Sequence, residues 1–258
     1  MGIDVEKDCF CWGLRVSTDL EIDLEYKTVV EEYTRVIQGE KVVYIDRGKG
    51  KNKLLVGLAT LMNKGVYAGV KSYYKDYPGD VLCLIDPDNT YYLRGDRGFH
   101  IRNVINEIVK DYKPENVVFC GASMAGFAAV DLALFFDANA VVNNPQINLD
   151  ATYETAWPKL REVLDQLEQK YNLDEISFRS RSSVIGAVFG QHPMDLVNRD
   201  ALFSLCSRAP GVGLIFGNSH DVEHKYYYQG INGFLKMVDM VFAHRELMNG
   251  INLKFPRA

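Results

Sequence analysis

After residue 54, the chain alternates short apolar runs with longer mixed segments. This alternation is typical of buried parallel strands joined by crossover helices. We predict strands at 54–58, 81–85, 117–120, 138–142 and 212–216. A helix is expected from about His100 to Tyr112, because its apolar residues share one face. The pattern therefore predicts an α/β fold, with a mostly parallel central sheet and helices on both faces.

Two parts of the chain depart from this rhythm. The N-terminal part has β-rich content, with strand-like segments at 10–16 and 27–37 and a turn at Gln38-Gly39-Glu40 that predicts a hairpin. Residues 146–211 contain an amphipathic helix that begins near Pro158. We interpret 1–258 as a single domain and 146–211 as a helical insertion. That insertion either caps an active site or packs on the sheet as an elaborated crossover.

Composition narrows the class of protein. Apolar residues make up 47% and charged residues 24% of the 258-residue chain, as in ordinary soluble globular proteins. The net charge of −5 argues against a nucleic-acid-binding surface. No apolar run reaches the roughly 20 residues that span a bilayer, and the first residues lack the order of a secretory signal. Five cysteines without framework spacing indicate a reducing compartment, so we expect a cytoplasmic protein.

The most informative motif lies at residues 115–130. An apolar run breaks at Gly121, and small residues then open a helical pattern around Ser123. A strand that turns sharply into a helix with serine at the apex is the nucleophile elbow of serine hydrolases. The turn requires small residues two positions before and after the serine, and Gly121 and Ala125 occupy these positions. A similar string elsewhere only joins a strand to a helix, so the motif requires an acid and a base from the rest of the chain.

With these strands and this motif, the chain resembles the α/β-hydrolase superfamily. It is most similar to a bacterial branch associated with surface-glycan and capsule biosynthesis and with glycoprotein O-acetylation. The resemblance covers roughly Leu54 to His244, and its motifs are residues 54–60, 84–87 with 91–93, 121–126 and Asn144-Pro145-Gln146. It implies an α/β-hydrolase-like sheet, a Ser–Asp–His triad in that chain order, and either ester hydrolysis or acyl transfer.

The chain order places the acid after Ser123. Asp221 lies in the loop that follows the predicted strand 212–216, where a triad acid belongs, and it is our candidate. Its alternative role is a cap or first-turn charge of the next helix. Asp195 and Asp200 fall within the insertion and are weaker candidates.

His244 is the candidate base, on one of two interpretations. In the first, residues 236–243 form the last strand and His244 lies on the loop beyond it. In the second, residues 233–249 form a helix that ends at Gly250, and His244 is a surface residue. In the first case His244 would take the proton of Ser123 while Asp221 orients the imidazole. The oxyanion would be bound by the backbone N–H of Met124 and by that of Thr60 or Leu61.

The other histidines are alternatives to His244. His220 and His224 are reserve bases, whereas His100 and His192 are interpreted as structural. Residues 220–224 also spell the His-x-x-Glu-His motif of zinc proteases. A third ligand is missing from the expected context, so we predict no metal and no cofactor.

The sequence therefore predicts a serine hydrolase of the esterase type, acting on a small-molecule or glycan acyl ester. The alternatives are an O-acyltransferase acting on a glycan and a non-catalytic α/β-hydrolase-like partner in a glycan or secretion assembly.

Overall fold

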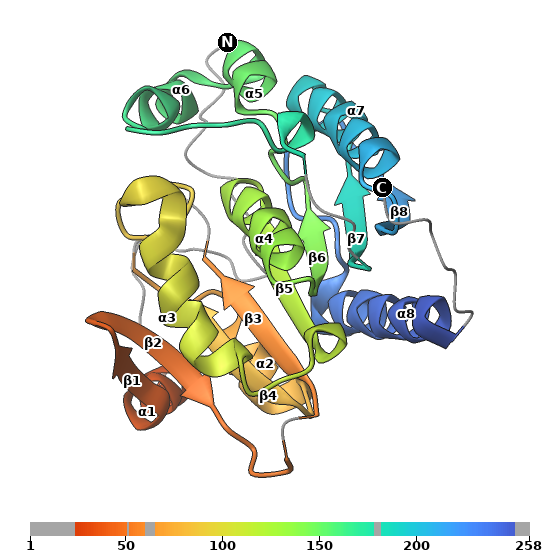
Figure 1. Cartoon of the computed structure of the whole chain (residues 1–258). Coiled ribbons are helices and arrows are strands. Elements are labelled where there is room, and N and C mark those ends of the chain that lie inside the picture. Colours follow the sequence, from red (N-terminus) through yellow and green to blue (C-terminus); the bar gives the residue numbers. More distant parts are fainter. Residues whose placement is uncertain (1–23, 51, 60–64, 178–181, 251–258) are drawn as a thin grey trace.

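The computed structural model describes residues 24–50, 52–59, 65–177 and 182–250. Within these residues, eight strands form one open sheet in the order β1-β2-β4-β3-β5-β6-β7-β8 (Figure 1). β1 and β2 pair antiparallel, as do β2 and β4, and all other pairs are parallel. The strands are β1 (Thr34–Ile37), β2 (Glu40–Ile45), β3 (Leu54–Leu58), β4 (Asp80–Leu84), β5 (Val117–Ala122), β6 (Asn139–Asn143), β7 (Val184–Phe189) and β8 (Gly213–Asn218). The predicted α/β class with a mostly parallel sheet is confirmed.

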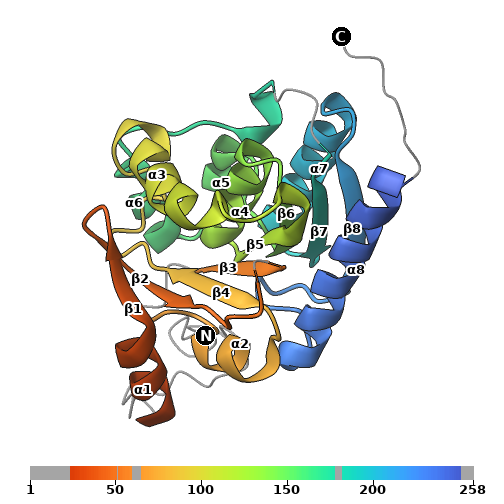
Figure 2. The same ribbon diagram turned by 60° about the horizontal axis from the view of Figure 1, so that its bottom comes forward.

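Helices cover both faces of the sheet (Figure 2). One face packs against α1 (Leu24–Tyr33), α2 (Val70–Asp76) and α8 (Gly230–Gly250). The other face packs against α3 (Phe99–Val109), α4 (Met124–Phe135) and α7 (Pro193–Arg208). α5 (Leu149–Thr155) packs against α7, and α6 (Pro158–Asp165) packs against α5. In the part of the chain that the structure describes, no helix combines the length and apolar character needed to cross a membrane.

The central strands are buried on both sides. In β5, Val117 and Phe119 belong to the core under α4, whereas Val118 and Cys120 belong to the core under α8. Successive side chains of a strand point to opposite faces, so a strand covered on both faces is apolar throughout. This explains the continuous apolar runs in the sequence.

The N-terminal region is less β-rich than expected. The hairpin is confirmed, because β1 and β2 pair with Ile37 opposite Glu40. Most of the strand-like segment 27–37 is instead helix α1, and the segment 10–16 lies outside the described residues. The helix forms because Tyr26, Val29, Val30 and Tyr33 follow the three- and four-residue spacing of one helix face and pack together. Their β-branched and aromatic character concealed that spacing.

Two elements in the second half of the chain also differ from expectation. β7 is a sheet strand inside the segment 146–211, and it lies between β6 and β8. It holds Gly186, where an added Cβ would come within 2.8 Å of Val241 on α8. Residues 236–243 are helical, so the strand interpretation of this segment was wrong and the helix interpretation is confirmed. The buried residues Phe234, Val238 and Val241 fit one helix face.

Candidate active site

Ser123 lies at the sharp turn between β5 and α4. Its backbone dihedrals are φ 53° and ψ −116°, which is a strained conformation for a residue other than glycine. Hydrogen bonds fix it: Ser123 N–H donates to the carbonyl of Asn143 (2.9 Å), and its own carbonyl accepts from Gly126 N–H (3.0 Å). The predicted strand–turn–helix around Ser123 is therefore present, with the hydroxyl at the carboxyl end of the central strand.

Two glycines allow the backbone segments at this turn to approach closely. A Cβ at Gly121 would collide with the carbonyl of Ala125. A Cβ at Gly126 would lie 2.8 Å from the Cα of Pro145, in the segment that follows β6. Gly126 therefore lets this segment pass directly beside the start of α4.

Ser123, His224 and Asp195 are linked by hydrogen bonds. His224 Nε2 lies 3.0 Å from Ser123 Oγ, and His224 Nδ1 bonds to Asp195 Oδ1. Asp195 comes from the first turn of α7, after β7, and His224 from the irregular segment after β8. The Asp195 side chain is 0% exposed and that of His224 is 12% exposed, so this chain of contacts is shielded from water.

The second carboxylate oxygen of Asp195 also has partners. Gly190 N–H donates to Oδ2 at 3.2 Å, and the Tyr227 hydroxyl, which also contacts the carbonyl of Glu223, lies 3.1 Å from the same oxygen. Burial and the nearby carboxylate raise the pKa of Tyr227, so its hydroxyl keeps its proton. A buried carboxylate requires such donors. They leave Oδ1 for the imidazole.

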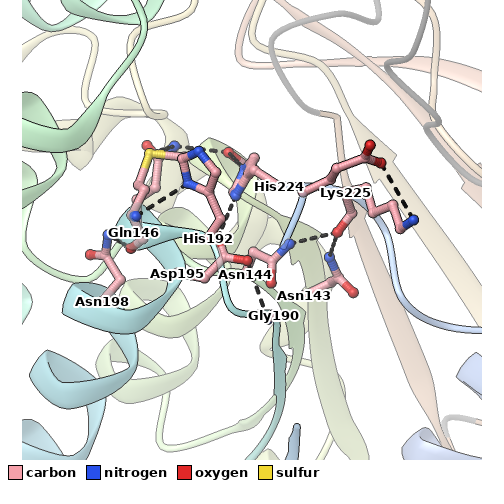
Figure 3. Close-up of polar contacts among 12 residues, drawn as sticks. Asn143, Asn144, Gln146, Gly190, His192, Asp195, Asn198, His224 and Lys225 are labelled. Carbon is pink, nitrogen blue, oxygen red and sulfur yellow. Dashed lines mark hydrogen bonds and ion pairs between the residues drawn. The ribbon is translucent and has the colours of Figure 1, made fainter. Parts of the chain in front are cut away.

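The segment that carries His224 has no helix or strand between residues 219 and 229. Side-chain amides hold it in place (Figure 3). Asn143 Nδ2 and Asn144 Nδ2 both donate to the carbonyl of Lys225, at 3.0 and 2.6 Å. Asn143 Oδ1 accepts from Tyr227 N–H at 2.8 Å. The end of β6 therefore fixes the residue next to His224.

The structure does not bring Asp221 and His244 to Ser123. Asp221 forms an ion pair with Lys225, and the hydrogen bond from that lysine lowers the pKa of the Asp221 carboxyl. His244 lies in α8, and its Nε2 would be 2.9 Å from a Cβ at Gly213. Gly213 begins β8, whereas Ser123 follows the last residue of β5. His244 therefore lies at the opposite end of the parallel strands from Ser123.

The candidate oxyanion donors fall in two places. Met124 is the first residue of α4, so its N–H lies beside Ser123 at the helix N-terminus. Thr60 and Leu61 lie outside the described residues. The residue before them, Ala59, is fixed by Tyr92, whose hydroxyl accepts from Ala59 N–H at 2.8 Å and contacts the Leu84 carbonyl at 3.2 Å.

The remaining candidates lie as follows. His192 is the N-cap of α7 and accepts from Met194 N–H at 3.2 Å through Nδ1. His100 contacts Glu40 at 3.0 Å, His220 is exposed, and Asp200 pairs with Arg199 on the surface. Residues 220–224 are not helical, so the one-turn spacing that the zinc-protease motif requires is not formed there. A different trio, His192, Asp195 and His224, places potential metal-ligating atoms within 4.8 Å of one another.

Gln146 joins the site, which the sequence analysis did not anticipate beyond the Asn-Pro-Gln motif. Its Nε2 donates to Ser123 Oγ at 2.8 Å, and its Oε1 accepts from the Tyr91 hydroxyl. Trp157, from the segment before α6, lies 5.8 Å from the His224 ring, centroid to centroid. The spacing of residues along the chain does not predict that the Gln146 amide lies next to Ser123.

Comparisons with known proteins bear on the fold. The profile of the "Uncharacterised protein family (UPF0227)" matches residues 92–205, a segment that includes Ser123 and Asp195 and ends before His224. No curated protein matches the sequence.

Several solved structures are similar. The capsule O-acetyltransferase of Neisseria meningitidis serogroup A is 15% identical with a TM-score of 0.57, and the match covers 83% of this chain and 99% of the other. A structure of a mutant of that protein in complex with CoA is 15% identical with a TM-score of 0.55, over 84% and 93% of the two chains. An esterase/lipase from an uncultured bacterium is 10% identical with a TM-score of 0.57, over 92% and 93%. At these identities the similarity shows the fold, and the chain has the α/β-hydrolase fold.

Proposed function

We propose that this protein is a serine hydrolase of the esterase type, which cleaves acyl esters through Ser123, His224 and Asp195. The observation that carries the proposal is the contact of His224 Nε2 with Ser123 Oγ at 3.0 Å, while the opposite ring nitrogen bonds to a fully buried carboxylate. The three residues follow β5, β7 and β8 in the chain order Ser, Asp, His. This is the chain order of α/β-hydrolase triads.

In the acylation step, Ser123 Oγ bonds to the ester carbonyl carbon while its proton passes to His224 Nε2. The carbonyl electron pair moves onto the oxygen to give an oxyanion. When this intermediate collapses, the C–O bond to the alcohol breaks, and the alcohol leaves with the proton from Nε2. In deacylation, water donates a proton to Nε2 and attacks the acyl group, and the acid leaves as Ser123 regains its proton.

Asp195 holds the imidazole with Nδ1 protonated, so Nε2 is free to accept the serine proton. The imidazolium that forms is stabilised by the buried carboxylate, which Gly190 N–H and the Tyr227 hydroxyl keep in place. Met124 N–H, at the N-terminus of α4, supplies one donor to the oxyanion. We propose that the second donor comes from Thr60 or Leu61, just beyond the residue that Tyr92 anchors.

The segment before β7 supports a role as a cap. In Figure 1, α5 and α6 lie at the end of the sheet toward which β6 and β7 point. Trp157, between these two helices, approaches the His224 ring. We propose that this segment shields the acyl-enzyme and forms part of the acyl or acceptor site.

A second candidate is transfer of the acyl group to a glycan hydroxyl instead of water. It is favoured by the similarity in fold to a capsule O-acetyltransferase that has been solved with CoA. The two reactions share the acyl-enzyme. Incubation with acetyl-CoA or a p-nitrophenyl ester, with and without a sugar acceptor, separates them: a hydrolase releases acid at the same rate in both cases, whereas a transferase requires the acceptor.

Labelling with a fluorophosphonate probe tests the proposal. The wild type should react at Ser123, and the Ser123→Ala variant should not react and should remain folded. His224→Gln and Asp195→Asn should slow labelling by on the order of 10³-fold or more. The matched controls His244→Gln and Asp221→Asn should label at the wild-type rate. A wild type that stays unlabelled would remove the hydrolase proposal and favour the non-catalytic alternative.

A further inference from the structure

We propose that Gln146 is a further catalytic residue, whose side-chain amide donates to Ser123 Oγ and stabilises the negative charge that develops there. This inference rests on the proposed function and adds to it a donor aimed at the nucleophile itself. The backbone donors discussed above face the carbonyl oxygen of the substrate instead.

The contact is close and shielded from water. Gln146 Nε2 lies 2.8 Å from Ser123 Oγ, compared with 3.0 Å for His224 Nε2. Gln146 is 0% exposed, so water does not compete for this amide. Its other contact at Nε2 is the Met194 sulfur at 3.9 Å, which is a weak acceptor. The serine oxygen is therefore the main partner of this buried donor.

Tyr91 holds the other end of the Gln146 amide. Its hydroxyl donates to Gln146 Oε1, and Tyr91 is itself 0% exposed. In this arrangement the NH₂ group points at Ser123. Because Oγ then accepts from Gln146, the proton of Oγ is directed to His224 Nε2. The reversed amide would draw this proton toward Oε1 and away from the base. Tyr91 is therefore a positioning residue that acts through Gln146.

The backbone brings Gln146 to this place. Gly126 allows Pro145 to pack against the start of α4, and Gln146 N–H donates to the Ser123 carbonyl at 3.3 Å. The Tyr91 ring lies edge-on against Phe127, with centroids 5.7 Å apart. Both supports belong to the elbow and its helix, so the amide is held relative to the nucleophile before substrate arrives.

The amide acts in both halves of the reaction. In acylation, the Oγ–H bond breaks as the Oγ–C bond forms, and charge on Oγ during proton transfer is stabilised by the N–H of Gln146. In deacylation, the Oγ–C bond breaks, the electron pair returns to Oγ, and the proton arrives from His224. The same N–H stabilises the departing oxygen. A donor placed at such an atom before reaction costs no reorganisation.

The test uses full-length Gln146→Met, which keeps the length of the side chain and removes the donor. Labelling of Ser123 by the fluorophosphonate probe, and kcat for a p-nitrophenyl ester, should fall by roughly 10- to 100-fold, with KM nearly unchanged. Gln166→Met, at an exposed glutamine at the end of α6, is the control and should behave as wild type. Tyr91→Phe should lower kcat by a smaller factor. It should have little further effect in the Gln146→Met background, because both act through one contact.

Gln146→Glu adds a second readout, which reports whether this position faces the serine and the base. This near-isostere replaces the donor with a carboxylate, which accepts the serine proton and favours the imidazolium form of the neighbouring base. We expect a greater loss of kcat than in Gln146→Met, and an acid limb of the pH–rate profile that moves to higher pH.

The outcomes separate the two proposals. Wild-type labelling with an unchanged rate in Gln146→Met would overturn the role of Gln146 and leave the hydrolase intact. An unlabelled wild type would overturn the hydrolase itself. If Gln146→Met shows no cooperative unfolding, it is not properly folded, and the other two variants decide. A wild-type acid limb in Gln146→Glu together with a wild-type rate in Tyr91→Phe would contradict the role of Gln146.

Discussion

The two sides of the candidate site are held in different ways. Ser123 is fixed by regular structure: β5 is buried between two helical layers, and α4 begins at the next residue. His224 belongs to a stretch without helix or strand, which the side chains of Asn143 and Asn144 tie to the end of β6. We call the part around Ser123 the nucleophile side and the part around His224 the base side. Substitutions that disturb the nucleophile side should reduce both stability and activity. Damage to the base side should cost mainly activity.

The largest combined effect on stability and activity is expected at the nucleophile side, in Gly126→Ala. The new methyl group would lie 2.8 Å from the Cα of Pro145, and backbone at this distance must move. Overpacking of this kind costs about 1–3 kcal/mol of unfolding free energy. Because Gln146 follows Pro145, esterase kcat should also fall, on the order of 10-fold or more.

The matched control is Gly233→Ala on α8, where an added Cβ meets its nearest atom at 3.9 Å. Alanine is favoured over glycine in a helix by about 1 kcal/mol, so this variant should be slightly more stable and fully active. Urea unfolding and ester hydrolysis on both variants provide the measurement. Equal stability of the two would show that the elbow is not tightly packed.

A smaller effect on stability, with a clear effect on rate, is expected at the base side in Asn144→Gly. Asn144 has φ 45°, which glycine adopts readily, so the change removes one hydrogen bond to Lys225 without adding backbone strain. The unfolding free energy should fall by about 1 kcal/mol, as for a typical hydrogen bond. Looser placement of His224 should reduce kcat by roughly 10-fold.

Asn89→Gly is the control for this variant, since Asn89 also has positive φ (54°) and its backbone N–H bonds to the carbonyl of Asp86. It should retain wild-type kcat. If Asn144→Gly is equally active, the amide bonds to Lys225 do not position the base.

The same contrast explains what the sequence revealed. The nucleophile side is encoded locally: an apolar run, a turn with Gly121 and a helix of small residues lie within 16 positions. Its strand, turn and helix were predicted correctly, as was the alternation of strands and helices from β3 to β6. The periodicity of apolar residues detects such segments because each strand or helix buries a regular set of its own side chains.

The base side depends on strand order, which the local pattern does not contain. β7 lies inside the predicted insertion 146–211 and was not predicted as a strand. The candidate acid, Asp221, was therefore placed after β8. The candidate base was in turn placed at His244, which lies in α8 at the opposite end of the strands from Ser123. His224 contacts Ser123 and Asp195 contacts His224, and these two residues are a reserve base and a weaker acid candidate of the sequence. The apolar run Val184–Phe189 is the signal that could have changed this ranking, because a strand there places Asp195 in the loop and helix that follow a sheet strand.

The smallest expected effect concerns the junction of the two sides, at His192. Burial, and then the nearby His224, lower the pKa of His192 from its ordinary value of 6.5. As the pH falls through 6.5, the unfolded chain therefore takes up this proton before the folded one does. The stability contributed by neutral His192 is complete above that pH and is lost as the pH falls toward the folded pKa. Protonation also removes the Nδ1 acceptor that caps α7 through Met194 N–H.

His192→Asn keeps a capping side chain and does not titrate. Its unfolding free energy, measured in urea at pH 7.5 and 5.5, should fall less with acidification than that of the wild type. His220→Asn, at an exposed histidine in the segment after β8, should keep the wild-type difference. An identical acid response in His192→Asn and wild type would show that the imidazole of His192 is as free to take up a proton in the folded protein as in the unfolded chain. Water would then reach the base side as far as the N-terminus of α7. The base side would be less protected from water, relative to the buried nucleophile side, than the hydrogen bonds around His224 indicate.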